Sequence, residues 1–185
     1  MNAPVERKGK WMQTVSGRAF WPLDPHPEEI DIEDIAHALG HMCRYGGHSS
    51  RFYSVAEHST LVSYFVPPEH ALAGLMHDAT EAYLVDVPRP IKHNLPTYRE
   101  IEGQLWAVIA VRFGLPLELP QAVHDADVAV LFAEQKALMK PSPLPDWGMG
   151  LTTPIDASSA HVVGWNPMTA KHDFLRRFHH LYKGK

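Results

Sequence analysis

Residues 54–81 read SVAEHSTLVSYFVPPEHALAGLMHDATE, and they contain the strongest indication of the architecture of this chain. Its apolar residues recur at helical spacing on both sides of Pro67-Pro68, which predicts one helix over 54–65 and another over 69–84. His58 lies nine residues before Pro67, and His77 lies nine residues after Pro68. If the two helices form an antiparallel hairpin, both imidazoles stand at the same height, ~13 Å from the turn.

Carboxylates accompany the two histidines. Asp78 follows His77 directly, and Glu81 comes four residues after His77, on the side of the helix that His77 faces. Asp127 lies far along the chain, in the apolar stripe of a helix expected over 120–139. A buried carboxylate needs a positive partner. A divalent ion held by four side chains would supply that partner: His58, His77, Asp78 and Asp127.

Each of these residues also has an ordinary structural explanation. His58 could be a core histidine with satisfied hydrogen bonds, and Asp127 could pair with a buried arginine. If the group does bind an ion, mixed imidazole and carboxylate ligands favour Mn, Co, Zn or Fe over calcium. If the site acts on a phosphate ester, a second ion (Mg, Mn or Co) could bind together with that phosphate.

The composition restricts the class of protein. The chain has 185 residues, is 45% hydrophobic and carries a net charge of -4, which suits one soluble domain without a broad nucleic-acid or membrane surface. A single cysteine, Cys43, excludes an internal disulfide and fits the reducing cytoplasm, or that of the host if a phage encodes the protein. The apolar runs are far shorter than the ~20 residues that a membrane span needs.

The remaining sequence predicts a mainly helical protein. We expect an N-terminal extension with a small hairpin over 1–25 and a single all-α domain over 26–185. The expected segments are a hairpin turning near Gly17, helices over 31–43, 98–113 and 120–139, an extended turn at Pro88-Arg89-Pro90, an irregular loop over 141–166 and a last helix beginning at Asn166-Pro167.

The order His58, His77-Asp78, Asp127 resembles the H…HD…D pattern of the HD-domain metal-dependent phosphohydrolases. Residues 77–92, HDATEAYLVDVPRPIK, resemble the bacterial 5′-deoxynucleotidase branch of that superfamily, and so does the segment from Cys43 to Ser59. Related small bacteriophage proteins look like dATP triphosphohydrolases. The resemblance implies an HD-domain helical bundle that cleaves the 5′ phosphoester of (deoxy)nucleotides.

The resemblance also implies roles for single residues. It assigns metal ligation to the four residues above, proton handling to Glu81 assisted by Asp86, and substrate binding to Arg44, Tyr45 and Lys92. His48 is a further candidate for substrate binding from its position between the helices. Two positions depart from the branch. Tyr45 stands where the branch has Trp beside the sugar, and Val85 stands where it usually has Gly before Asp86, which implies a shift of that loop.

Three functions remain open from the sequence. The protein could be a dNMP 5′-nucleotidase, a dNTP triphosphohydrolase, or a non-catalytic metal-containing nucleotide sensor. Arg51, Tyr53 and Arg89 are further candidates for nucleotide contact, whereas His124 and Asp125 are predicted to point away from the site. The expected partners are a small nucleotide and further copies of the chain, in a dimer or larger homo-oligomer, with no nucleic acid and no membrane.

Overall fold

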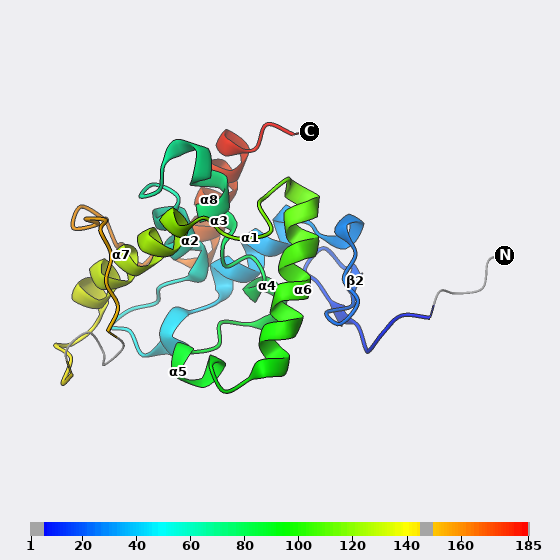
Figure 1. The fold of residues 1–185 in the computed structure, drawn as a ribbon, viewed down its shortest axis with the longest axis horizontal. Helices are drawn as coiled ribbons and strands as arrows, with labels where there is room; N and C mark the ends of the chain where they lie inside the picture. The colour runs from blue at the N-terminus through cyan, green and yellow to red at the C-terminus, as the bar shows by residue number, and fades with distance from the viewer. Residues whose placement is uncertain (1–5, 145–149, 185) are drawn as a thin grey trace.

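The computed structural model describes residues 6–144 and 150–184. It is mostly helical, with one small antiparallel sheet near the N-terminus, as the sequence predicts (Figure 1). The helices are α1 (Ile32–His41), α2 (Val55–Val62), α3 (Ala71–Met76), α4 (Glu81–Leu84), α5 (Arg89–Lys92), α6 (Pro96–Phe113), α7 (Gln121–Leu138) and α8 (Pro167–Leu181). Three short 3-10 segments lie between them at Pro27–Glu29, Arg44–Gly47 and Pro68–His70. None of the described helices combines the length and apolarity that crossing a membrane requires.

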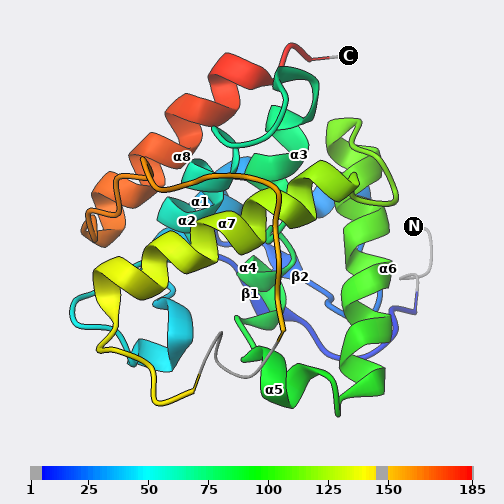
Figure 2. The ribbon, with the colours of Figure 1, turned by 60° about the vertical axis from the view of Figure 1, so that its left-hand side comes forward.

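Helix α2 is the centre of the molecule. All of its residues, Val55–Val62, are buried, and it contacts α1, α3, α7 and α8. In Figure 2, α7 crosses the region of α1 and α2, and α8 lies above it on the other side of that region. Ser54 caps the helix, because its hydroxyl accepts a hydrogen bond from the backbone N–H of Glu57. His58 therefore projects from an element that has no solvent-exposed side.

Two apolar clusters surround α2. The larger one joins α1, α3, α6 and α8 and includes Leu39, Leu75, Ile109 and Phe174, each with no exposed surface. The second joins α2 to α7 and includes Tyr53, Val62, Val123 and Val130. Each such side chain contributes about 1.5–3 kcal/mol by its burial. The second cluster fixes which face of α7 is turned toward His58.

The N-terminal hairpin and the helix caps predicted at Asp31 and Asn166 are confirmed, whereas the helix expected over 31–43 ends at His41 and the one expected over 98–113 begins at Pro96. Strands β1 (Met12–Gln13) and β2 (Ala19–Phe20) pair antiparallel around a turn in which Gly17 has φ 85°. The Asp31 carboxylate accepts from Glu33 N at the start of α1, and the Asn166 side chain accepts from Thr169 N at the start of α8.

The helix expected over 69–84 is in fact broken, and this expectation is wrong. The chain forms a 3-10 turn, then α3, then a turn over His77–Thr80, then α4. Through that turn the hydrogen bonds join residues three apart, such as Ala79 N to Met76 O at 2.9 Å and Glu81 N to Asp78 O at 3.0 Å. The tighter spacing rotates Asp78 and Glu81 relative to their positions in a continuous helix. The helix expected over 54–65 likewise ends earlier, at Val62.

The extended turn expected at Pro88-Arg89-Pro90 is also wrong, because Arg89–Lys92 forms the short helix α5. Proline is tolerated in the first turn of a helix, where its missing N–H has no intrahelical partner to lose. Pro88 has an extended ψ of 133° and precedes the helix as its cap residue, and Pro90 lies within the first turn. This helix carries both Arg89 and Lys92.

The loop predicted over 141–166 contains no helix or strand in the part that the structure describes, and 145–149 lie outside the described residues. The C-terminal end of this loop is hydrogen-bonded to α2. The buried Glu57 carboxylate accepts from the backbone N–H groups of Val163, Gly164 and Trp165 at 2.8, 2.9 and 2.6 Å. Gly164 has φ 81°, and a Cβ there would lie 2.8 Å from the carbonyl oxygen of Phe52. Only glycine therefore fits this close approach.

Val85, between α4 and α5, has an unfavourable backbone conformation. Its φ is 67° and its ψ 158°, a region that is essentially restricted to glycine. The loop thus keeps a glycine-type conformation although the residue is β-branched, and the side chain is 59% exposed. The strain is about 1–3 kcal/mol for a non-glycine residue.

We expect Val85→Gly to stabilise the protein. Relief of strain should exceed the ~0.5–1 kcal/mol entropic cost of glycine and raise the melting temperature by about 2–4 °C. The control is Val111→Gly, an exposed valine within α6, which should lower the melting temperature because glycine is a poorer helix former. A lower melting temperature for Val85→Gly would contradict the strain at this position.

Candidate metal centre

Three side chains from three helical elements converge below the surface. His58 projects from α2, His77 lies at the C-terminal end of α3, and Asp127 projects from α7. His58 Nε2 lies 3.3 Å from His77 Nε2 and 3.2 Å from Asp127 Oδ1, and His77 Nε2 lies 4.0 Å from the same Oδ1. One ligand atom from each residue thus falls within 4.8 Å of the others, a group that could hold a metal ion.

Asp78 adds a carboxylate beside this group. Its Oδ2 lies 3.3 Å from His77 Nε2 and 3.6 Å from His58 Nε2. The four residues selected from the sequence are therefore neighbours in space, although Asp127 follows Asp78 by 49 positions. Two nitrogens and the oxygens of two carboxylates are a donor set that suits a divalent transition metal.

Hydrogen bonds orient both imidazoles toward the centre. His58 Nδ1 lies 2.6 Å from Glu134 Oε1, and His77 Nδ1 lies 2.8 Å from the carbonyl oxygen of Gly74. Since a carboxylate and a carbonyl only accept, each Nδ1–H donates, and both Nε2 atoms face the group. Fixing the ring nitrogen that is not a ligand is typical of metal-binding histidines.

Asp127 divides its two oxygens between different partners. Oδ1 faces the histidines, whereas Oδ2 forms a short ion pair with Arg89 from α5. The sequence left open whether Asp127 belongs to a metal-binding group or pairs with an arginine. Both arrangements are present, because Oδ1 faces the histidines and Oδ2 pairs with Arg89. Arg89 is only half-buried, its side chain being 40% exposed.

The electrostatics of the group favour a bound cation. Burial and Arg44 oppose protonation of His58, but Glu134 and Asp127 outweigh them and raise its pKa to about 9. Burial opposes ionisation of Asp127, but the hydrogen bond and charge of His58 hold its pKa well below the usual range. Burial also lowers the pKa of His77. The carboxylates therefore stay ionised and attract positive charge to the point where the Nε2 atoms meet.

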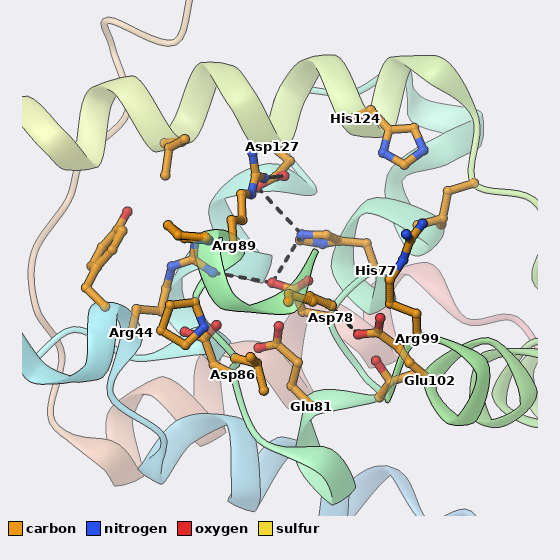
Figure 3. A pocket seen from close by; sticks show the side chains of 18 of the residues that line it. Arg44, His77, Asp78, Glu81, Asp86, Arg89, Arg99, Glu102, His124 and Asp127 are labelled. Carbon is orange, nitrogen blue, oxygen red and sulfur yellow. Dashed lines mark hydrogen bonds and ion pairs between the residues drawn. The ribbon is translucent and has the colours of Figure 1, made fainter. Parts of the chain in front are cut away.

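The group lies at one wall of a cavity of about 880 Å³ (Figure 3). Nine of the ten site residues expected from the sequence line it: Arg44, Tyr45, His48, His77, Asp78, Glu81, Asp86, Lys92 and Asp127. His58, the tenth, is fully buried behind this wall. In Figure 3, Arg44 and Asp86 lie on one side of the central Asp78, and Arg99, Glu102 and His124 lie on the other.

The charged lining of the cavity is largely paired. Arg44 Nη1 lies 3.4 Å from Asp78 Oδ2, and Lys92 Nζ lies 2.5 Å from Glu102 Oε1. Glu81 differs, because its Oε2 is buried and has no hydrogen-bond partner among the described residues. Burial, followed by the negative charges of Asp78 and Asp86, raises the pKa of Glu81 well above its usual range. Both influences favour the neutral form of the Glu81 carboxyl.

Several secondary expectations need correction. Arg51 does not line the cavity; its guanidinium donates to the carbonyls of Val162 and Val163 at 2.9 Å and holds the long loop. Tyr53 is fully buried and donates to Glu134 at 2.7 Å. His124 is exposed as predicted but lines the cavity, because α7 is oriented with His124 on the same side as Asp127.

The residue that sequence reasoning missed is Glu134. It has no exposed surface, and it contacts His58, Tyr45, Tyr53 and Arg44. The signal was available, since Glu134 lies seven residues after Asp127 and four after the buried Val130, in the same apolar stripe of α7. The rule that singled out Asp127 applies equally to this second carboxylate.

Comparison with known proteins identifies the family. No protein-family model matches the chain. The chain is 44% identical to the uncharacterized protein YfdR of Escherichia coli strain K12, over 69% of this chain and 72% of YfdR. The chain belongs to the YfdR family. It is also 40% identical to an uncharacterized protein of Rhodobacter capsulatus, over 70% of this chain and 74% of that protein.

For this YfdR-family protein we expect His77→Ala to abolish specific metal binding. Wild-type protein should bind about one equivalent of Co²⁺ or Mn²⁺, and saturating metal should raise its stability by about 2–4 kcal/mol. His77→Ala removes one Nε2 donor and should lose both effects, while His161→Ala, an exposed histidine of the long loop, should retain them. Equal metal content in the two variants, measured by equilibrium dialysis, would contradict the site.

Proposed function

We propose that this protein is an HD-domain metal-dependent phosphohydrolase that cleaves the 5′ phosphoester of (deoxy)nucleotides. The observation that carries the proposal is the meeting of His58, His77 and Asp127 at the wall of a cavity. Asp78 lies beside this group, and the cavity also holds a buried acid, Glu81, and basic side chains. The order of these residues along the chain supports the HD pattern.

The donor set fits a divalent transition metal that His58, His77, Asp78 and Asp127 would hold. When bound, such an ion lowers the pKa of its water and polarises a phosphoryl oxygen. The protein contributes two imidazoles whose Nδ1–H groups are already engaged and an Asp127 whose Oδ2 is held by Arg89. This preorganisation limits the rearrangement that binding requires.

Glu81 is the candidate for proton transfer. Because burial and the charges of Asp78 and Asp86 favour its neutral form, Glu81 can donate a proton to the 5′ oxygen that leaves the phosphorus. Its Oε2 makes no competing hydrogen bond within the described part of the chain. Asp86 acts through Glu81, by making ionisation of the Glu81 carboxyl less favourable.

The basic residues of the cavity would bind the phosphate. Arg44 is buried and is held between Asp78 and Glu134, so its orientation is fixed before substrate arrives. Lys92 offers a point charge on the α5 side, where Glu102 keeps it in place. Tyr45 and His48 complete the wall next to Arg44 and would contact the sugar and base.

The direct test is incubation of the purified protein with Mn²⁺ or Co²⁺ and each common deoxynucleoside mono- and triphosphate. Chromatography of the products separates phosphate from tripolyphosphate. Phosphate and nucleoside from monophosphates would identify a 5′-nucleotidase, and tripolyphosphate from a dNTP would identify a triphosphohydrolase. Bound metal without turnover would reject the enzymatic proposal in favour of a nucleotide sensor.

Glu81→Ala should separate catalysis from metal binding. We expect kcat to fall roughly 10²-fold or more, the contribution of general acid–base catalysis, while metal content stays at the wild-type level. In wild-type protein, turnover should decline as pH rises through the elevated pKa of Glu81, because the neutral acid is the active form. Glu81→Ala should lack this alkaline decline, and an unaltered pH profile would contradict the role of Glu81.

The position of Arg99 supports a dNTP triphosphohydrolase over a 5′-nucleotidase. This residue lines the cavity from α6, beyond His77 as seen from Arg44, and it has no ion-pair partner in the part of the chain that the structure describes. His124 lines the same side from α7. A substrate that places its sugar near Tyr45 and its α-phosphate near the metal ligands would extend further phosphates toward Arg99.

We therefore expect Arg99→Ala to affect only the longer substrates. The KM for the preferred dNTP should rise about tenfold, equivalent to about 1.4 kcal/mol. The KM for the matching monophosphate, which ends before Arg99, should change less than about twofold, within the scale of a surface substitution. Equal effects on both substrates would show that Arg99 does not distinguish them.

A further inference from the structure

Glu134 is a buried carboxylate that the proposed mechanism does not use. It lies on α7, has no exposed surface, and accepts hydrogen bonds from three side chains of two other segments. A buried carboxylate is costly unless its oxygens are fully paired. Its retention inside the apolar stripe of α7 therefore calls for an explanation beyond packing.

The two oxygens of Glu134 face two different parts of the site. Oε1 accepts from His58 Nδ1 at 2.6 Å and from the Tyr53 hydroxyl at 2.7 Å. Oε2 accepts a short hydrogen bond from the Tyr45 hydroxyl and lies 3.5 Å from Arg44 Nε. One oxygen therefore contacts His58, a proposed metal ligand. The other contacts Arg44 and Tyr45, which line the cavity and form the proposed substrate wall.

We propose that Glu134 is a positioning residue that fixes His58 for metal binding and, through its other oxygen, fixes the wall formed by Arg44 and Tyr45. This inference rests on the proposed metal site. The carboxylate engages the Nδ1–H of His58, so that Nε2 is the nitrogen that a metal would bind, and it holds the plane of the ring. One side chain thus sets the metal site and the adjacent wall together.

A charged carboxylate is the group that this position requires. All of its neighbours are donors: an imidazole N–H, two phenolic hydroxyls and a guanidinium. A glutamine would turn an NH₂ group toward one of these pairs and would remove the charge opposite Arg44. Glu134→Gln therefore keeps the volume of the side chain and removes the property on which the inference depends.

The test measures Co²⁺ affinity by competition with a chelator, together with the visible absorption spectrum of bound Co²⁺ and the melting temperature of each variant. We expect Glu134→Gln to weaken Co²⁺ binding about 10–100-fold and to change the spectrum, which reports the ligand field at His58. The same variant should raise the KM for nucleotide, because Arg44 and Tyr45 lose their anchor.

Glu57→Gln is the matched control. Glu57 precedes His58 on α2 and is also a buried carboxylate, but it binds only the backbone of the long loop. Its substitution should lower the melting temperature while Co²⁺ affinity stays within about threefold, below the scale of outer-shell effects on a metal site. Equal losses of affinity in Glu57→Gln and Glu134→Gln would overturn the inference, because both would then reflect stability alone.

Two further measurements separate the possible failures. If His58→Ala binds Co²⁺ as tightly as wild type, the proposed metal site itself is wrong. If His58→Ala loses the metal and Glu134→Gln does not, only the positioning role is wrong. Should Glu134→Gln fail to fold, nitrogen-15 NMR of the Zn²⁺-bound wild type decides: a proton on His58 Nδ1 is expected, and ligation through Nδ1 would overturn the inference.

Discussion

The hydrogen bond between His58 Nδ1 and Glu134 Oε1, 2.6 Å long and buried at both ends, is the interaction on which the rest of the site depends. Neither group could be buried alone without a large desolvation cost. Their pairing offsets that cost only if α2 and α7 pack with these two faces in contact. The same packing brings Asp127, two turns earlier on α7, to within 3.2 Å of the free Nε2 of His58. The alignment of two helices therefore sets the geometry of the metal group.

Charge is balanced around the group from two sides. Arg44 stands between Asp78 and Glu134, and Arg89 pairs with the outer oxygen of Asp127. These arginines pair with carboxylates without occupying the point at which the two Nε2 atoms meet. A cation placed there would contact donors that are already oriented, which is the property of a preorganised binding site. Glu81 lies outside this balance, and burial beside negative charge favours its neutral form.

The broken helix after Pro68 shows where local sequence information ends. The apolar spacing of residues 69–84 is compatible with one continuous helix, and helix propensity does not mark a break at His77. The break is a change of hydrogen-bond spacing from four residues to three, and the chain makes it where His77 and Asp78 meet His58. Tertiary contacts thus select between two backbone arrangements of similar local energy. The short helix α5, which carries Arg89 to Asp127, is a similar case.

By itself the sequence determined the helical class, the caps at Asp31 and Asn166, the N-terminal hairpin and the convergence of His58, His77 and Asp127, because periodicity and polar residues in apolar stripes report burial directly. Only the tertiary structure decided which partner each oxygen of Asp127 has, where the third helix breaks, and that Glu134 joins the metal group to the substrate wall. These features depend on contacts between α2, α5 and α7. Such contacts are set by the packing of distant segments, and no local pattern in the chain records them.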